Sequence, residues 1–353
     1  MATTLQPEAA AKVNQELSAI LHRAAVASLD DVGWIRVTGS DRVRWLNGMV
    51  TNSIATLAPG HGCYNFVLNA QGRIVGDLTA FALEDSILLE ASRHQIPTLL
   101  AHFDHFIIMD DVELADISDQ RSGILIVGPD SLSTIQQLGG APCSTPAPPA
   151  PSPSTIRLKQ TDYRGAAVDL IEAYSPLILR FEIWSSSQTI DLILTELACV
   201  PKGSSTALEA LRILEGTPRY NTDIRNTESA KDLPQETAQT HALHFAKGCY
   251  LGQEIVERIR SRGNVHRTFT GFQLTGSLPA AGTPLQSEGK PVGELTSVSA
   301  IDLLSGPIQL ALGYIRREAL QRNLPLEYPG GTATPATLPF NLESITSNPS
   351  SEQ

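Results

Sequence analysis

The sequence contains little cysteine. Its 353 residues include four, at Cys63, Cys143, Cys199 and Cys249. They are far apart, form no Cys-x-x-Cys pair and have no histidine at metal-ligand spacing, which disfavours a zinc or iron–sulfur site held by this chain alone. A disulfide framework is equally disfavoured at this length and cysteine density. We therefore expect reduced, intracellular thiols and no metal ligands.

Long apolar runs and targeting signals are also missing. No uninterrupted apolar stretch approaches the ~18 residues that a membrane span needs. The N-terminus, MATTLQPEAAAKVNQELSAI, has no basic region followed by an apolar core and is not rich in arginine, which argues against secretion and mitochondrial import. With 42% hydrophobic and 18% charged residues, the composition is that of a soluble globular protein. The sequence thus predicts a cytoplasmic protein, most simply bacterial, with no membrane partner.

Positive charge is scarce. The chain has 26 Lys and Arg against 37 Asp and Glu, a net charge of -11, so its surface as a whole repels nucleic acid. One local basic run could receive a polyglutamate tail, a partner protein or RNA, although a solvated helix end is the favoured interpretation. No aromatic residues alternate with it, which disfavours nucleic acid. The run consists of Arg258, Arg260, Arg262, His266 and Arg267.

Alternating helical and strand patterns predict an α+β fold. Residues 1–29 are expected to form an N-terminal helical segment, with the helix over 6–29. A region over 30–264 follows, interrupted by a Pro/Ala/Ser-rich insert at 141–155. After it, short strands separated by glycines indicate a small antiparallel β-barrel over 265–337, and 338–353 should be a disordered tail. Within the second region, Ser40 or Asp41 is a candidate helix N-cap, and Val43, Leu46 and Val50 form an apolar stripe.

The segment FAKGCYLGQEIVERI, residues 245–259, is the most informative stretch. A helix is expected from about Gly252, so Cys249 would lie just ahead of its first turn. Free N–H groups at a helix start favour a thiolate, and Lys247 could add a positive charge, which together predict a reactive thiol. The alternative is that Cys249 is a small buried hydrophobic residue, the commoner fate of a lone cysteine.

This segment carries a family resemblance. KGCYLGQE resembles the signature K-G-C-Y-x-G-Q-E of the YgfZ-type folate-binding proteins, relatives of the glycine-cleavage T-protein. Other blocks are similar to that family over roughly residues 30–335: IRVTGSDRVRWLNGMVTNSI, YNFVLNAQGRIVGDL, LRILEGTPRYNTDI with Pro234-Gln235-Glu236 after it, and GKPVGELTSVS…ALGYIRRE.

The resemblance implies a T-protein-like fold of three subdomains around a central channel, ending in a small antiparallel barrel. It implies tetrahydrofolate or a derivative as cofactor, and iron–sulfur enzymes or cluster-assembly proteins as partners beside folate. The YgfZ branch supports assembly or repair of iron–sulfur enzymes in a folate-linked manner. Cys249 would then be a sulfur or cluster contact, or the reacting group of a folate-dependent step.

The T-protein's folate pocket can be carried over residue by residue. Its acidic pair falls on Gly76 and Asp77, so one acid is absent. A tyrosine–glycine element falls on Tyr163 and Gly165. A glutamate falls near Asp169 if one gap is allowed, and an arginine falls on Arg212.

The predicted site therefore combines two catalytic candidates with seven cofactor-binding ones. The alternatives to cofactor binding are structural roles, as a turn carboxylate for Asp77 and as a surface cation for Arg212. The catalytic candidates are Cys249 and Lys247, and the cofactor-binding ones are Asp77, Tyr163, Asp169, Arg212, Tyr250, Gln253 and Glu254.

Three functions remain open at this stage. The leading one is a tetrahydrofolate-binding accessory protein for iron–sulfur enzymes that uses Cys249. The second is a folate-dependent aminomethyl- or methyltransferase, which Gly76 disfavours because aminomethyl transfer needs a positioned acid. The third is a non-catalytic scaffold with a vestigial folate channel.

Overall fold

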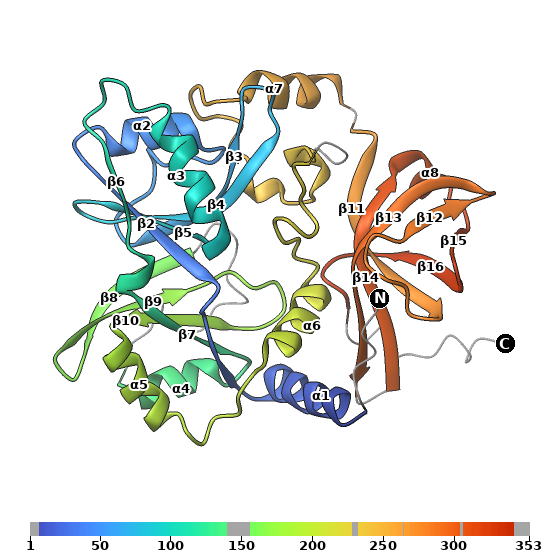
Figure 1. Cartoon of the computed structure of the whole chain (residues 1–353), viewed down its shortest axis with the longest axis horizontal. Helices are drawn as coiled ribbons and strands as arrows, with labels where there is room; N and C mark the ends of the chain where they lie inside the picture. Colours follow the sequence, from blue (N-terminus) through green and yellow to red (C-terminus); the bar gives the residue numbers. More distant parts are fainter. Residues whose placement is uncertain (1–6, 140–155, 228–231, 264, 304–305, 342–353) are drawn as a thin grey trace. The chain divides into compact units, whose positions relative to one another are not determined.

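The computed structural model describes residues 7–139, 156–227, 232–263, 265–303 and 306–341 (Figure 1). The chain forms two compact units. Unit 1 comprises Met1–Ser18, Gly203–Ala238 and Ile259–Gln353, and unit 2 comprises Ala19–Lys202 and Gln239–Arg258. The predicted insert at 141–155, with Cys143, and residues 342–353 of the predicted tail lie outside the described residues.

Unit 2 is built on a ten-stranded sheet. From one edge to the other the strand order is β1-β7-β10-β9-β8-β3-β4-β5-β2-β6, and each strand runs antiparallel to its neighbours. The strands are β1 Ala25–Ser28, β2 Val32–Thr38, β3 His61–Leu68, β4 Ile74–Ala82, β5 Ile87–Ser92, β6 Glu113–Asp116, β7 Ser122–Val127, β8 Ile156–Tyr163, β9 Ala166–Glu172 and β10 Arg180–Ser185.

The sheet contains an internal duplication. The order strand–helix–three strands–helix occurs twice, as β2-α2-β3-β4-β5-α3 and as β7-α4-β8-β9-β10-α5, which we call the first and second repeats. In the sheet, β3-β4-β5-β2 is mirrored by β8-β9-β10-β7, and the two halves join where β3 pairs with β8. The helices are α2 Arg42–Met49, α3 Ile96–Asp104, α4 Ser131–Gln137 and α5 Ser187–Glu196.

Both repeats use the same strand-to-helix turn. It reads Gly39-Ser40-Asp41 in the first repeat and Gly128-Pro129-Asp130 in the second. The two glycines have φ of +99° and +128°, and a Cβ there would lie 2.0 Å from Asp111 O and 2.4 Å from Arg23 O. Only glycine fits such a turn. Asp41 precedes α2 as expected, but its carboxylate accepts from the Asp111 N–H rather than capping the helix.

Each repeat has its own apolar core between its helices and the sheet. In the first, Leu46 and Val50 are buried as predicted, but Val43 is 37% exposed. The buried face of α2 runs instead through Trp45, Leu46 and Met49, and this face leaves Val43 outward.

The N-terminal helix is shorter than predicted. Helix α1 covers Pro7–His22, and the end of the expected helix forms strand β1. There Val26 pairs with Ile126 of β7 and is buried. Burial of a β-branched side chain against a neighbouring strand overrides the helical pattern.

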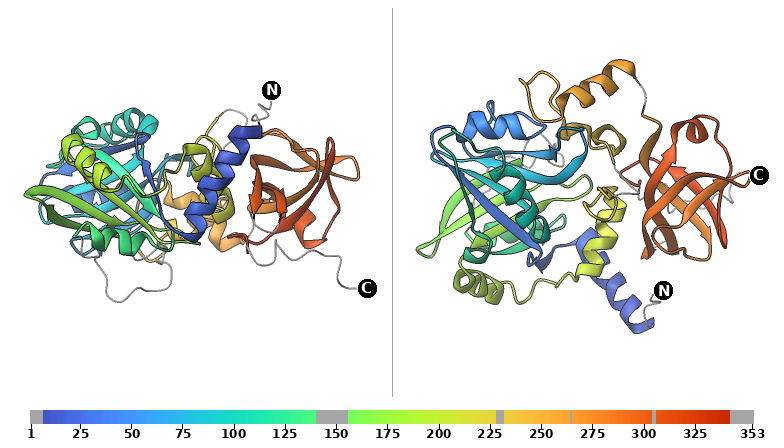
Figure 2. Two further views of the ribbon diagram at one scale, coloured as in Figure 1. Left: turned by 90° about the horizontal axis from the view of Figure 1, so that it is seen from below. Right: turned by 45° about the horizontal axis from the view of Figure 1, so that its top comes forward.

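Unit 1 contains the closed β-barrel, which confirms the predicted antiparallel barrel (Figures 1 and 2). The strand order around it is β11-β14-β13-β12-β15-β16. Helices α6 Ser205–Glu215 and α8 Arg317–Gln321 belong to the same unit. The strands are β11 Arg267–Gly276, β12 Pro284–Ser287, β13 Lys290–Leu303, β14 Gly306–Arg316, β15 Leu326–Tyr328 and β16 Gly331–Ala336.

The first residues of the predicted tail are folded. Phe340 is 1% exposed, and its N–H donates to Leu214 O of α6 at 2.9 Å. The disordered tail predicted from residue 338 is therefore wrong at its start. Burial of the aromatic side chain of Phe340 stabilises this segment.

A cluster of buried charges ties the segment before residue 238 to the barrel within unit 1. Arg267 Nη2, from β11, donates to Asp232 at 2.5 Å and to Glu236 at 3.0 Å. Both acids are buried, at 0% and 6% exposed. Arg225 pairs with Glu294 of β13 at 2.7 Å. Arg267 of the predicted basic run is therefore a structural cation.

Candidate functional site

The KGCYLGQE motif, residues 247–254, lies against the first repeat of unit 2. Helix α7 Gln253–Arg262 begins directly after Gly252, as predicted. Gly252 has a φ of +82°, and a Cβ on it would lie 2.6 Å from Asn69 O in the β3–β4 turn. The Leu251 N–H donates to Gly48 O of α2 at 3.0 Å. The second glycine of the motif thus allows close contact between two backbones.

Lys247 binds the end of α2. Its Nζ donates to the carbonyl oxygens of Asn47, Val50 and Asn52, each at 2.6 Å. Burial lowers the pKa of Lys247 to about 8. Three acceptors match the three N–H groups of an ammonium. Its donors are therefore used by the last carbonyls of a helix, which have no partner within that helix.

Cys249 is exposed and reduced, and the neighbouring Gly248 faces open space. Cys63 is different, because it is buried and burial raises its pKa to about 11. A buried thiol of this kind is chemically inert at neutral pH. Cys249 is thus accessible to a reactant.

Two of the predicted cofactor-binding residues of the motif hold the backbone in place. Tyr250 is 8% exposed, burial raises its pKa to about 12, and Lys247 Nζ lies 5.0 Å from the centre of its ring. The Tyr250 N–H donates to Gln253 Oε1 at 3.2 Å. Glu254 is exposed in the first turn of α7, where a carboxylate suits the helix dipole.

Asp77, on β4, is the centre of a polar group on unit 2. The hydroxyl of Tyr64 donates to Asp77 Oδ2 at 2.7 Å, and Gln95 Nε2 donates to Oδ1 at 2.8 Å. Burial raises the pKa of this carboxyl, against the effect of these hydrogen bonds. Asp77 is therefore held in a fixed orientation rather than acting as a turn cap.

Aromatic rings extend from this group. The ring centres of Tyr64 and Tyr174 each lie 5.5 Å from that of His241. Asn52 Nδ2 links the backbone beneath them, donating to Tyr64 O at 3.1 Å and to His241 O at 2.9 Å. Burial lowers the pKa of His241, so the ring is neutral at pH 7. All three rings are half-buried, which leaves part of each open to a ligand.

Sequence reasoning missed these three rings. They come from β3, from the residues after β9 and from the short helix η4 Thr240–Ala242. No spacing in the sequence connects the three. Only Tyr64 lies in a block that carried the family resemblance, and it has no fixed place in any motif.

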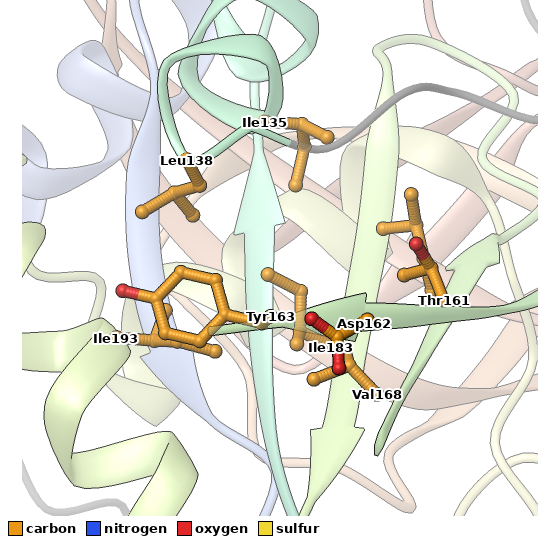
Figure 3. Close-up of a pocket in the computed structure, with 9 residues that line it drawn as sticks. Ile135, Leu138, Thr161, Asp162, Tyr163, Val168, Ile183 and Ile193 are labelled. Carbon is orange, nitrogen blue, oxygen red and sulfur yellow. The ribbon is translucent and has the colours of Figure 1, made fainter. Parts of the chain in front are cut away.

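The other predicted pocket residues of unit 2 lie in the second repeat. Tyr163 lines a small pocket near the end of β8 (Figure 3). Asp169 accepts from Arg121 Nη2 at 2.5 Å, and this guanidinium lies 4.2 Å from the centre of the Trp34 ring. Asp169 therefore pairs with the largely buried Arg121, whereas Asp77 accepts from Tyr64 and Gln95.

The same face of the sheet holds a carboxyl pair. Glu90 of β5 faces Glu182 of β10, which is 2% exposed and accepts from Arg180 and Trp184. Burial, and then the charge of Glu182, raise the pKa of Glu90. Ionisation of Glu90 is therefore costly, because its charge would lie beside that of Glu182.

This pair predicts a pH dependence. A carboxyl with a raised pKa binds its proton more tightly in the folded state than in the unfolded state. The free energy of unfolding therefore falls as the pH rises above the pKa that the carboxyl has in the unfolded state, with a slope of up to about 1.4 kcal/mol per pH unit. The loss ends once the folded pKa is passed. Glu90→Gln should remove this slope and raise stability at pH 7. Urea unfolding of both proteins between pH 5 and 8 tests this, and parallel curves would contradict it.

Arg212 belongs to unit 1. Its guanidinium makes five hydrogen bonds, two to Glu209 and one each to Thr217 O, Asp223 and Ser297. Five is the number of N–H donors that a guanidinium has. Acceptors within the protein therefore occupy all five N–H donors of Arg212, the side chain that was predicted to bind folate.

Comparison with known proteins shows which families and folds this chain is similar to. Residues 3–168 match the family described as the GCVT N-terminal domain, and residues 267–343 match the CAF17 C-terminal beta-barrel domain. Among the described residues, no helix is long and apolar enough to cross a membrane.

Relatives match most of the chain. A chloroplastic Arabidopsis thaliana protein, named as a candidate transferase, is 27% identical over 311 residues, 87% of this chain and 68% of its own length. The aminomethyltransferase of Thermus thermophilus is 27% identical over 308 residues, 84% of this chain and 81% of its own. The glycine cleavage system aminomethyltransferase T of Bartonella henselae has the same fold, with a TM-score of 0.78 at 19% identity, covering 93% of this chain and 89% of that one. The two domain matches and these relatives support placing the chain in the T-protein superfamily of aminomethyltransferase-like proteins.

Proposed function

We propose that the chain is a tetrahydrofolate-binding accessory protein that supports assembly or repair of iron–sulfur enzymes through Cys249. The GCVT match supports a folate-type cofactor in general terms. The CAF17 barrel match is consistent with an iron–sulfur role. A cytoplasmic location remains a prediction, and the Arabidopsis relative is chloroplastic.

The residues around Asp77 fit a pterin. A carboxylate accepts from the ring N–H and the 2-amino group of a pterin together. Half-buried rings such as Tyr64, His241 and Tyr174 suit stacking against a flat heterocycle. When bound, tetrahydrofolate would supply a nitrogen that carries a one-carbon unit. Asp77 would orient the heterocycle, because Tyr64 and Gln95 hold the carboxylate in one position.

The observation that carries the proposal is the contrast within KGCYLGQE. Lys247, Tyr250, Gly252 and Gln253 each have a contact that fixes the backbone of the motif. Cys249, between them, is exposed. A rigid backbone that presents a free thiol suits a nucleophile or a sulfur contact.

Aminomethyl transfer is the second candidate, favoured by the names of the relatives. Gly76 stands where the T-protein has an acid. A Cβ at this position would lie 2.8 Å from both Gln95 Oε1 and Leu99 Cδ2. An acidic side chain would therefore displace Gln95, which orients Asp77. The structure thus supports folate binding without the second acid.

Tetrahydrofolate titration by calorimetry tests the cofactor, and complementation tests the thiol. Wild type and Cys249→Ala should bind alike, whereas Asp77→Asn should bind roughly tenfold more weakly because the charge on the acceptor is lost. In cells lacking this chain, Cys249→Ala should fail to restore iron–sulfur enzyme activity.

Cys199→Ala is the matched control, since Cys199 is also an exposed free thiol. It should restore that activity fully. Absence of saturable binding to the wild type would refute the folate part, and full rescue by Cys249→Ala would refute the thiol part. Aminomethyl transfer in a glycine-cleavage assay would establish the second candidate instead.

A further inference from the structure

The two repeats of unit 2 differ in what covers their helix–sheet cores. In the first repeat, Leu251 comes from outside the repeat and packs against the core. Its N–H also binds Gly48 O of α2. The turn before α7 thus places an aliphatic side chain beside the last turn of α2.

The second repeat has a pocket at the corresponding place. Ile135 and Leu138 lie seven and ten residues after Gly128, as Leu46 and Met49 lie after Gly39. Both line the pocket, with Tyr163 and Ile193 below them in Figure 3. Every residue that lines it belongs to the second repeat. Among the residues that the structure describes, which exclude 140–155, no side chain from outside the repeat contributes to this lining, in contrast to Leu251 in the first repeat.

The pocket suits an aliphatic group. Its walls are mainly Ile, Leu and Val side chains, with the exposed Asp162 at the rim. The pocket is open on one side, and its volume is ≈ 30 Å³, above the ~10–15 Å³ that one water molecule needs. Apolar walls offer water too few hydrogen bonds, so an apolar group is the better occupant.

The charge at the rim of the pocket indicates which kind of residue should stand before the aliphatic residue in the bound segment. In the first repeat, the last carbonyls of α2 bind the ammonium of Lys247, four residues before Leu251. The last turn of α4 presents the same negative helix end. Asp162 adds a carboxylate, while the nearby Arg164 and Glu196 pair with each other. The rim therefore favours a cation.

We propose that this pocket binds a partner protein through a segment that carries a basic residue four positions before an aliphatic side chain, as Lys247 stands before Leu251. The internal duplication and the charge of the rim both point to this occupant. The site is independent of Asp77 and Cys249, so the proposal does not rest on the folate function.

A fluorescent peptide copying residues 246–254, with serine in place of the cysteine, is the probe. Anisotropy titration with the full chain should show saturable binding below about 1 mM. Leu251→Ala in the peptide, or Leu138→Phe in the protein, should weaken binding roughly tenfold, because each removes the aliphatic fit. Asp162→Lys should weaken binding and reduce its salt dependence. Because Asp162 Oδ1 also accepts from the Gly165 N–H of the β8–β9 turn, Asp162→Asn, which keeps that acceptor, is the matched variant and should shift binding in the same direction.

Three outcomes would overturn the proposal. One is the absence of saturable binding. Another is binding that neither Leu138→Phe nor Asp162→Lys changes, which would place the peptide elsewhere. The third is binding that occurs only after deletion of residues 141–153, which would make the chain's own segment the occupant.

Discussion

An Arg267→Met variant should unfold with a free energy about 3 kcal/mol below that of the parent protein, because removing one partner of a buried ion pair leaves the other charge uncompensated. Methionine retains most of the apolar length of arginine, so the loss is mainly electrostatic. The carboxylates left behind are Asp232 and Glu236. Burial already raises the pKa of Asp232, and loss of the cation should raise it further.

The measurement has to report on unit 1. All three tryptophans, Trp34, Trp45 and Trp184, lie in unit 2, so tryptophan fluorescence would not follow the barrel. Hydrogen exchange of the amides in β11 and β14 reports on it directly.

Two further variants define the cause. Arg322→Met removes an exposed pair with Glu318 and should cost at most about 0.5 kcal/mol. Adding Asp232→Asn to Arg267→Met should restore part of the stability, because the uncompensated charge is then gone. Equal losses for Arg267→Met and Arg322→Met would show that the cluster contributes no more than a surface pair.

Gly252→Ala is expected to lower the free energy of unfolding of unit 2 by about 3 kcal/mol, since alanine at positive φ costs about 1 kcal/mol and the contact with Asn69 O must also open. The Cβ would lie 2.6 Å from that oxygen, and backbone cannot yield as a flexible side chain can. The motif should then separate from the β3–β4 turn. Urea unfolding followed by tryptophan fluorescence measures the loss.

Gly248→Ala is the control for this change. It lies on the other side of Cys249, and its Cβ would face open space. Its effect should stay within about 0.5 kcal/mol. Comparable losses at both positions would mean that glycine is needed for backbone freedom throughout the motif, rather than for one contact.

The predictable parts of the molecule were local ones. Helix α7 begins where the Gly252-Gln253 pattern placed it, and the glycine-punctuated strands form the barrel. Both depend on residues close together in the chain. The duplication also left a local signal, in VTGSD at 37–41 and IVGPD at 126–130. Sequence reasoning identified the helix cap at Ser40 or Asp41 but did not compare this turn with the second one.

The partners of charged side chains could not be predicted. Arg212 and Asp169 have residue types suited to folate, yet their partners are Asp223 and Arg121. Arg121 lies 48 residues from Asp169 in sequence, and no pattern specifies that contact. The rings around Asp77 were missed for the same reason, because three distant segments supply them. Lys247 was predicted beside a thiol, whereas the fold directs it to helix carbonyls.

The pairing of β3 with β8, where the two repeats join, bears on how the sheet evolved. Among the described residues, which begin again at Ile156, β3 and β8 pair at two positions, His61 with Arg157 and Gly62 with Ile156. These equivalent strands of the two halves meet edge to edge in antiparallel fashion, as two copies of one ancestral subunit would across a two-fold axis. Fusion of such a homodimer frees each copy to diverge. The first repeat could then keep Asp77 and contact the cysteine motif, while the second formed the pair of Asp169 with Arg121 and the open pocket.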